Sequence, residues 1–282
     1  MADRDAIADP VIRRAVASLL ATGVVDGLYL AGSHGTGQAD AFSDIDLVAV
    51  AAPDAHGAVA DAWQTALAAE VEVVHWDRQS RWGTLVNAIT VAWTRVDLFV
   101  VQDLRGRAQD ALRPVHDRDG LWADLPPKTG AKHPDPAQIT RTATEAIRIL
   151  GLLPLGIGRQ EWVTLYWGLS LLRTMIVDLS IQEAAHPHRG GALHLRRQVS
   201  DAVHDRLAHL PQGGPSRPAM EAAFHAHAAE LLPLARRLAG ATGATWPTRF
   251  EEVTRAVLAD RLGFQMPPAQ PGPSPETLVT HN

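Results

Sequence analysis

Strand patterns in this sequence end at one place along the chain, and that division constrains the fold more than any other feature. Before residue 125, short runs rich in β-forming residues alternate with helical patterns. After residue 135, apolar residues recur at helical spacing only. Between the two parts, proline and glycine interrupt regular structure in Pro126-Pro127-Lys128-Thr129-Gly130 and Pro134-Asp135-Pro136. We therefore predict two domains, at residues 1–125 and 136–264.

The first domain is expected to be α/β (α+β) with a mixed sheet, and the second an all-helical bundle. Strands are predicted at residues 27–31, 45–50, 71–76 and 88–101, and helices at 10–22 and 56–69. Bundle helices are predicted at 136–153, 159–184, 191–210, 218–238 and 247–262, with Pro233 bending the fourth of these. The tail, residues 265–282, is rich in proline and poor in large apolar residues, so we expect it to be disordered.

Composition narrows the cellular setting. Hydrophobic residues make up 46% of the chain and charged residues 20%, as in ordinary globular proteins. No uninterrupted apolar run approaches the roughly 18 residues that span a bilayer, and the acidic start, with Asp3, Asp5 and Asp9, is unlike a secretory signal. The absence of cysteine excludes disulfides and thiolate catalysis and suits a reducing cytosol. We expect a cytoplasmic protein without a membrane partner, either a monomer or a homodimer.

Charge is distributed unevenly between the two parts. Residues 1–124 contain 18 acidic and 10 basic side chains, a balance of −8, whereas residues 125–282 have 13 acidic and 16 basic, a balance of +3. Proteins that bind nucleic acid normally carry a basic surplus that neutralises phosphates. The acidic first part therefore disfavours a nucleic-acid partner and favours a cationic or neutral small substrate.

Two aspartates, Asp44 and Asp46, stand two residues apart in a predicted strand. Side chains alternate along a strand, so both aspartates point to one face while Ile45 and Leu47 point to the core. Two neighbouring carboxylates repel each other unless a cation lies between them, and such hard oxygen ligands suit Mg²⁺ that is shared with substrate phosphates. We predict that Asp44 and Asp46 are metal ligands.

A Gly-Ser pair, Gly32-Ser33, precedes the two aspartates, between the first two predicted strands. Glycine lets the backbone approach a phosphate closely, and a serine at the start of a helix offers its hydroxyl and backbone N–H groups. Such a pair by itself is also common turn chemistry. Next to two metal-binding aspartates, however, it predicts the position of a bound phosphate.

A third carboxylate, Asp97, lies on a later strand between Val96 and Leu98. A charged group among apolar neighbours is costly to bury unless it has a partner. Metal ions beside Asp44 and Asp46 would be that partner, or Asp97 accepts a proton from an attacking hydroxyl as the general base. Glu72, on an earlier predicted strand, is the alternative third carboxylate.

The stretch from Leu28 to Val100 resembles the DNA polymerase β-type nucleotidyltransferase superfamily. That pattern is a Gly-Ser pair, a spacer, Asp-x-Asp or Asp-x-Glu, and a third carboxylate on a later strand, and it is matched by Gly32-Ser33, Ser43-Asp44-Ile45-Asp46-Leu47 and Val96-Asp97-Leu98. A short catalytic domain followed by a helical domain of similar length is similar to the antibiotic nucleotidyltransferases, particularly the aminoglycoside and lincosamide enzymes. The motifs cover about the first 125 residues, and the remainder is similar only in architecture.

This resemblance implies a Mg²⁺-dependent transfer of a nucleoside monophosphate, usually AMP from ATP, to a hydroxyl of a small molecule. Gly32 and Ser33 would hold the triphosphate, Asp44, Asp46 and Asp97 the metal, and Asp97 would be the catalytic base. The alternatives are a protein-modifying adenylyltransferase or antitoxin of the minimal nucleotidyltransferase type, and a catalytically silent binding module.

The helical part contributes candidates for substrate and nucleotide binding. Basic side chains that are candidates for the β- and γ-phosphates are Lys132, Arg148, Arg173 and Arg196. Tyr166 and Trp167 are candidates for stacking on the base, although aromatic residues at helical spacing more often belong to a core.

Overall fold

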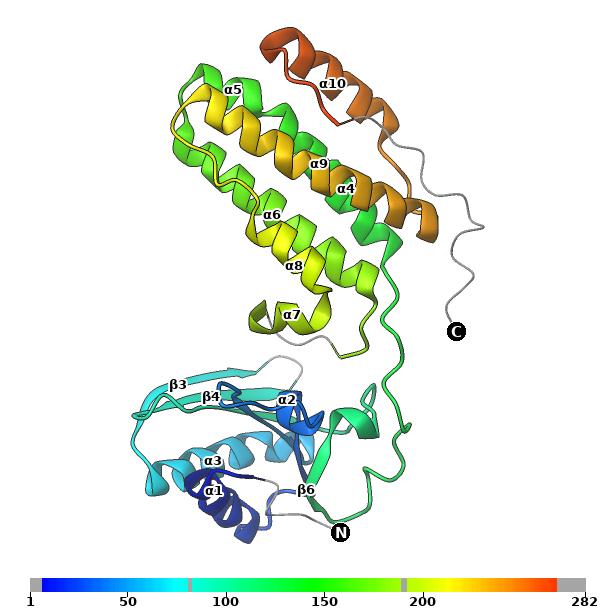
Figure 1. Cartoon of the computed structure of the whole chain (residues 1–282). Helices are drawn as coiled ribbons and strands as arrows, with labels where there is room; N and C mark the ends of the chain where they lie inside the picture. Colours follow the sequence, from blue (N-terminus) through cyan, green and yellow to red (C-terminus); the bar gives the residue numbers. More distant parts are fainter. Residues whose placement is uncertain (1–6, 81–82, 189–191, 268–282) are drawn as a thin grey trace. The chain divides into compact units, whose positions relative to one another are not determined.

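The computed structural model describes residues 7–80, 83–188 and 192–267. The chain divides into two compact units, Met1–Gly130 and Ala131–Asn282 (Figure 1). Each unit has a hydrophobic core of its own.

The first unit is built on a six-stranded mixed sheet in the order β3-β4-β5-β2-β1-β6. Its strands are β1 (Gly27–Leu30), β2 (Ile45–Val50), β3 (Val73–Ser80), β4 (Thr84–Thr90), β5 (Arg95–Val101) and β6 (Arg113–Asp117). All neighbouring strands are antiparallel except β2 and β5, which run parallel at the centre of the sheet. The α3 helix and the β3–β4 hairpin lie in the sequence between these two parallel strands.

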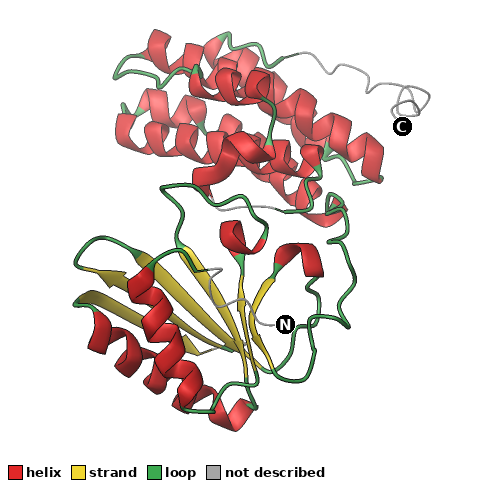
Figure 2. Ribbon diagram, turned by 60° about the horizontal axis from the view of Figure 1, so that its bottom comes forward, coloured by secondary structure: helices red, strands yellow, loops and turns green. Residues whose placement is uncertain are grey.

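One face of the sheet is covered by α1 (Pro10–Ala21) and α3 (His56–Glu70) (Figure 2). Asp9 caps α1 by accepting hydrogen bonds from the backbone N–H groups of Val11 and Ile12. Apolar residues at helical spacing in α1 and α3 bury themselves against the inward side chains of β1, β2, β4 and β5. The opposite face is packed only in part, by a smaller cluster around the buried Tyr29, with the partly buried Trp122 packed against it. Polar strand residues are therefore left on this second face.

Several strand boundaries predicted from the sequence of this unit differ from those in the structure. The predicted strand at 88–101 is the end of β4, a turn, and β5, because the turn Val91-Ala92-Trp93 contains none of the usual turn residues. Strand β3 continues through the polar segment to Ser80, because its pairing with β4 overrides the local preference. Strand β6 was not predicted; it pairs with β1, and the Tyr29 hydroxyl donates a 2.8 Å hydrogen bond to Asp117.

The second unit is all-helical in the described residues and packs around a continuous apolar core (Figure 2). Its long helices are α4 (Pro136–Gly151), α6 (Trp162–Ala184), α9 (Arg217–Thr242) and α10 (Thr248–Leu262), and its short ones are α5 (Leu153–Gly158), α7 (Leu195–Gln198) and α8 (Asp201–Ala208). Helix α9 packs on both α4 and α6, and α10 packs on α4. The predicted fold class, a mixed-sheet α/β (α+β) domain followed by a helical bundle, is confirmed.

The helical predictions differ from the structure in detail. The helix predicted at 191–210 is two short helices, because Ser200 caps α8 by accepting a hydrogen bond from Val203 N–H. Helix α9 continues through Pro233 as a single helix. Met266, at the start of the predicted disordered tail, is buried in the helical core, and residues 268–282 of that tail lie outside the described residues. No helix in the described ranges is long and apolar enough to cross a membrane.

Candidate active site

Asp46 and Asp97 lie side by side at the centre of the sheet. They are register partners on the parallel strands β2 and β5. Partners on neighbouring strands are about 4.8 Å apart and point to the same face of the sheet. That face is opposite to α1 and α3, because the intervening Ile45, Leu47 and Leu98 are buried in the core beneath those helices. Both aspartates are half-buried.

Asp44 was predicted to lie within the strand, but β2 begins at Ile45, so Asp44 immediately precedes it and pairs with a basic residue. Its carboxylate forms a 3.3 Å ion pair with the Arg95 guanidinium at the start of β5. Arg95 also donates a 3.5 Å hydrogen bond to the carbonyl of Phe42, in the loop before β2. Because both side chains of the ion pair are partly exposed, the pair is weak enough for another cation to compete with Arg95.

The Gly-Ser pair packs directly against one of these carboxylates. Gly32 begins the short helix α2 (Gly32–Gly35) with φ +52°, and a Cβ at this position would lie 1.9 Å from Oδ2 of Asp46. Only glycine fits here, for both reasons. The next residue, Ser33, is buried, and its Oγ has no hydrogen-bond partner among the described residues. A buried hydroxyl without a partner is costly unless a ligand supplies one.

These residues fit a metal–triphosphate group. Within residues 7–80, 83–188 and 192–267, no three His, Cys, Asp or Glu side chains are arranged to hold a metal ion by themselves. A Mg²⁺ ion that arrives with a nucleotide needs only one or two protein carboxylates, because phosphate oxygens and water complete its octahedron. Asp46 and Asp97 are such a pair, and the unpartnered hydroxyl of Ser33, one residue after the Gly32 that packs against Asp46, would suit a phosphate oxygen.

The two candidates for the third carboxylate occupy different places. Asp97 is next to Asp46, whereas Glu72 is exposed and precedes β3, the outermost strand on that side of the sheet. Strands β4 and β5 separate β3 from β2. The geometry therefore groups Asp97, and not Glu72, with the Asp-x-Asp pair.

Sequence reasoning missed polar residues that share this face. Asn87 on β4 is the register partner of Asp97, and Asp77 on β3 is the register partner of Asn87. Asp77 accepts a 2.7 Å hydrogen bond from the Gln79 side chain. A row of polar side chains thus crosses four strands, from Asp77 to Asp46. No signal in the sequence could have revealed it, because it depends on strand register.

His34 in α2 lies near the Asp-x-Asp pair and also escaped the sequence reasoning. Burial lowers the pKa of His34, and the nearby Asp44 carboxylate opposes part of that effect. The histidine is therefore held mainly neutral at physiological pH.

Three of the basic candidates in the helical unit form hydrogen bonds or ion pairs with other residues of that unit. Arg148 makes hydrogen bonds of 2.6 and 2.7 Å with Glu145, Arg173 donates to the carbonyl of Leu210, and Arg196 pairs with Asp201. Lys132 lies in the exposed segment before α4.

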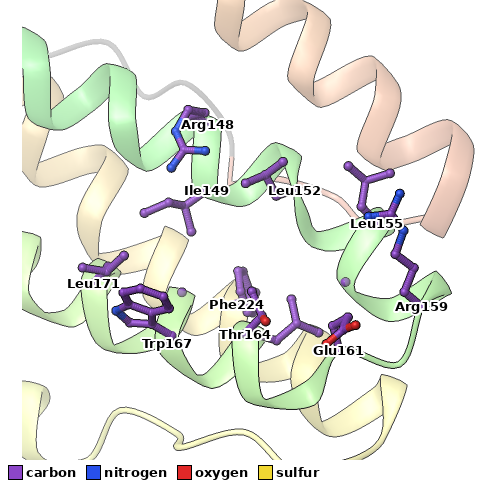
Figure 3. Close-up of a pocket in the computed structure, with 13 residues that line it drawn as sticks. Arg148, Ile149, Leu152, Leu155, Arg159, Glu161, Thr164, Trp167, Leu171 and Phe224 are labelled. Atoms are coloured by element: carbon purple, nitrogen blue, oxygen red, sulfur yellow. The ribbon is translucent and has the colours of Figure 1, made fainter.

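Two of the helical candidates line one pocket. Trp167 is 68% exposed, whereas Tyr166 is partly buried against the core. Trp167 and Arg148 flank a largely apolar pocket of about 470 Å³ between α4, α5 and α6, with Phe224 among its lining residues (Figure 3). The structure thus assigns Trp167 to a pocket wall rather than to the core.

Comparison with known proteins gives little beyond this geometry. No protein-family model and no curated protein sequence matches the chain. Among solved structures, the chain is similar to an aminoglycoside 6-adenyltransferase from Bacillus subtilis, with 10% sequence identity and a TM-score of 0.42, over 88% of this chain and 97% of that one. At that distance the likeness carries no weight for function.

Proposed function

We propose that this protein is a Mg²⁺-dependent nucleotidyltransferase that moves a nucleoside monophosphate, AMP from ATP in the first instance, to a hydroxyl of a small molecule. The observation that carries the proposal is the register of β2 and β5, with Asp46 beside Asp97 and the glycine of Gly32-Ser33 against Asp46. The buried, unpartnered Ser33 hydroxyl adds a donor suited to a phosphate oxygen.

Each residue has a distinct task in the proposed reaction. The acceptor oxygen bonds to the α-phosphorus while the bond between that phosphorus and the oxygen bridging to the β-phosphate breaks, and pyrophosphate leaves with the electron pair. Asp97 takes the proton of the acceptor hydroxyl, since it lies on the same face as the metal-binding aspartates. Gly32 lets the phosphates approach the sheet, and Ser33 donates a hydrogen bond to one of them.

Asp46 and Asp97 would hold Mg²⁺, and Asp44 would be a third ligand only if its ion pair with Arg95 opened. When bound, Mg²⁺ neutralises phosphate charge and stabilises the attacking and leaving oxygens. Without a cation, the aspartates would repel the triphosphate that they face.

The proposed acceptor is a cationic or neutral small molecule, with aminoglycosides slightly ahead of lincosamides. The −8 balance of residues 1–124 supports this order, because an acidic surface attracts polycationic molecules. The resemblance in the motifs points to the same acceptors.

A pyrophosphate-release screen tests the proposal. The full chain is assayed with each of the four common ribonucleoside triphosphates, against aminoglycosides, lincosamides and mixed metabolites, with Mg²⁺ or with EDTA. We expect release only when nucleotide, acceptor and Mg²⁺ are all present, and none from Asp46→Asn. Equal nucleotide affinity in EDTA and in excess Mg²⁺, measured by calorimetry, would refute the proposal. Pyrophosphate release in which the nucleoside monophosphate becomes attached to a protein, and not to the small acceptor, would favour the protein-modifying alternative.

A further inference from the structure

A second pocket lies at the ends of the central strands β1, β2 and β5, where Leu30, Ile45 and Arg95 line it. It measures about 480 Å³ and is lined by the start of α1, by α2, by the loop before β2 and by the β4–β5 turn. Arg95, the partner of Asp44, forms part of its wall. All of its lining residues belong to the first unit. Its size is within the range of small-molecule sites.

An exposed aromatic residue in a strained conformation lines this pocket. Trp93 has φ +62° and is 74% exposed. It is the last residue of a three-residue hairpin loop, in which Trp93 N–H donates to Thr90 and Thr90 N–H donates to Thr94. That position requires the left-handed conformation, which glycine or asparagine adopts at lower cost. Stability therefore does not explain a tryptophan here, and residues held in such conformations cluster at ligand sites.

A second aromatic ring lines the same pocket without packing in the core. Phe42, in the loop before β2, is 89% exposed. An exposed phenylalanine by itself needs no explanation. Together with Trp93, however, it gives the pocket two ring faces that are available to a ligand.

The charges around the pocket favour a cationic ligand. Asp9 and Asp40 are both lining residues, and each accepts local hydrogen bonds that orient its carboxylate. Arg95 is the basic residue of the lining that carries a full charge, and Asp44 balances it. The other titratable group is His34, whose pKa is lowered by burial. Aromatic ring faces and carboxylates are together the groups that bind protonated amines.

We propose that this pocket, with Trp93, Phe42, Asp9 and Asp40, binds the amine-bearing ring of the acceptor. That the bound amine is the acceptor rests on the proposed function, whereas the binding of an amine in this pocket does not. The indole of Trp93 would cover the C–H face of the ring and its adjacent ammonium group, and the carboxylates would hold the amines. Arg95, which lines the pocket and pairs with Asp44, would connect the bound ring to the aspartate pair.

Fluorine NMR of the full chain labelled with fluorotryptophan tests the pocket directly. The probe is deoxystreptamine, a ring with two protonated amines, and the matched control is myo-inositol, a neutral ring of similar size. The Trp93 signal is assigned by its loss in Trp93→Phe. We expect deoxystreptamine to shift this signal and myo-inositol to leave it in place. No shift with deoxystreptamine, or equal shifts with both compounds, would overturn the inference.

Variants separate ligand binding from a structural role. Trp93→Gly relieves the backbone strain, so its melting temperature should be unchanged or higher while its dissociation constant for deoxystreptamine rises about tenfold. A purely structural tryptophan would instead give a lower melting temperature. Asp40→Asn should also weaken the binding of deoxystreptamine. Val91→Ala, in the same turn but outside the pocket, is the control and should bind normally; an effect as large as that of Trp93→Gly would contradict the assignment.

Nucleotide binding in the same preparation distinguishes two kinds of failure. If ATP binds with Mg²⁺ but Trp93 does not respond to deoxystreptamine, the pocket assignment is wrong and the proposed function stands. If Trp93 responds but ATP does not bind with Mg²⁺, the pocket is an amine site and the proposed function is wrong.

Discussion

At the scale of single residues, substitutions of Asp46 and Asp97 should have different effects on nucleotide affinity and on turnover. Asp46→Asn removes charge where the nucleotide is anchored, so nucleotide affinity and turnover should fall together. Asp97→Asn removes the proposed proton acceptor and should cost about 10²–10⁴ in rate, whereas its nucleotide affinity should fall less than that of Asp46→Asn, because Asp46 still binds Mg²⁺. Calorimetry and steady-state kinetics measure the two effects. Glu72→Gln is the control and should be silent, because Glu72 is exposed at the edge of the sheet. Full turnover in Asp97→Asn would remove it from the site.

Two glycines with positive φ separate backbone strain from steric exclusion. A Cβ added to Gly37, which has φ +71°, would meet no heavy atom within 4 Å, whereas a Cβ added to Gly32 would meet Asp46 Oδ2 at 1.9 Å. Gly37→Ala should therefore cost about 1–2 kcal/mol of unfolding free energy, from strain alone. Gly32→Ala should cost more and also abolish nucleotide binding. Urea denaturation and calorimetry measure both quantities, and equal effects of the two substitutions would contradict the packing seen at Asp46.

At the scale of elements, one buried carboxylate ties α9 to α10. Glu251 accepts hydrogen bonds from Arg236, from Arg255 at 2.7 Å and from the Trp246 indole at 2.7 Å, and Arg236 lies over the Trp246 ring. Glu251→Gln leaves two guanidinium groups without their anion, so we expect a loss of about 3–5 kcal/mol in chemical denaturation. The adjacent Glu252→Gln breaks only an exposed pair with Arg249 and should cost at most about 1 kcal/mol.

The same network predicts a pH dependence. Burial by itself would raise the pKa of Glu251, but hydrogen bonds from Trp246, Arg255 and Arg236 outweigh burial and lower it below the ordinary value of 4.5. A carboxylate with a lowered folded-state pKa adds stability above its unfolded pKa, and this stability is lost as pH falls through the folded value. The stability difference between the wild type and Glu251→Gln should therefore be constant near neutrality and narrow below pH 4.5. Denaturation series at several pH values check this, and a gap that widens in acid would contradict it.

At the scale of the whole molecule, the two units have separate cores, and unfolding should reflect this. The helical core is formed within residues 139–266, and the apolar clusters of the sheet lie within residues 7–125. Calorimetry of the full chain should therefore show two transitions. Saturating Mg²⁺–ATP should move the transition of the first unit to higher temperature, because a hundredfold excess over Kd adds about 2.7 kcal/mol to its unfolding free energy. Glu251→Gln should lower the other transition. A single transition that both changes move equally would show that the units unfold as one.

Much of the fold followed from the sequence because the relevant rules act over short distances. Alternation placed Asp46 opposite Ile45 and Leu47, and helical spacing located α1, α3, α4, α9 and α10. Local rules failed where long-range pairing decides the outcome. They missed β6, which depends on β1, and the turn at Trp93, which lacks the usual turn residues.

The sequence by itself determined which residue types were available for the site: a Gly-Ser pair, an Asp-x-Asp pair and two candidates for the third carboxylate. Only the tertiary structure placed Asp97, and not Glu72, beside Asp46, and only it aligned Asn87 and Asp77 with them. The physical reason is that strand pairing joins residues far apart in the chain. Its register depends on the burial of a whole sheet face, which no local pattern encodes.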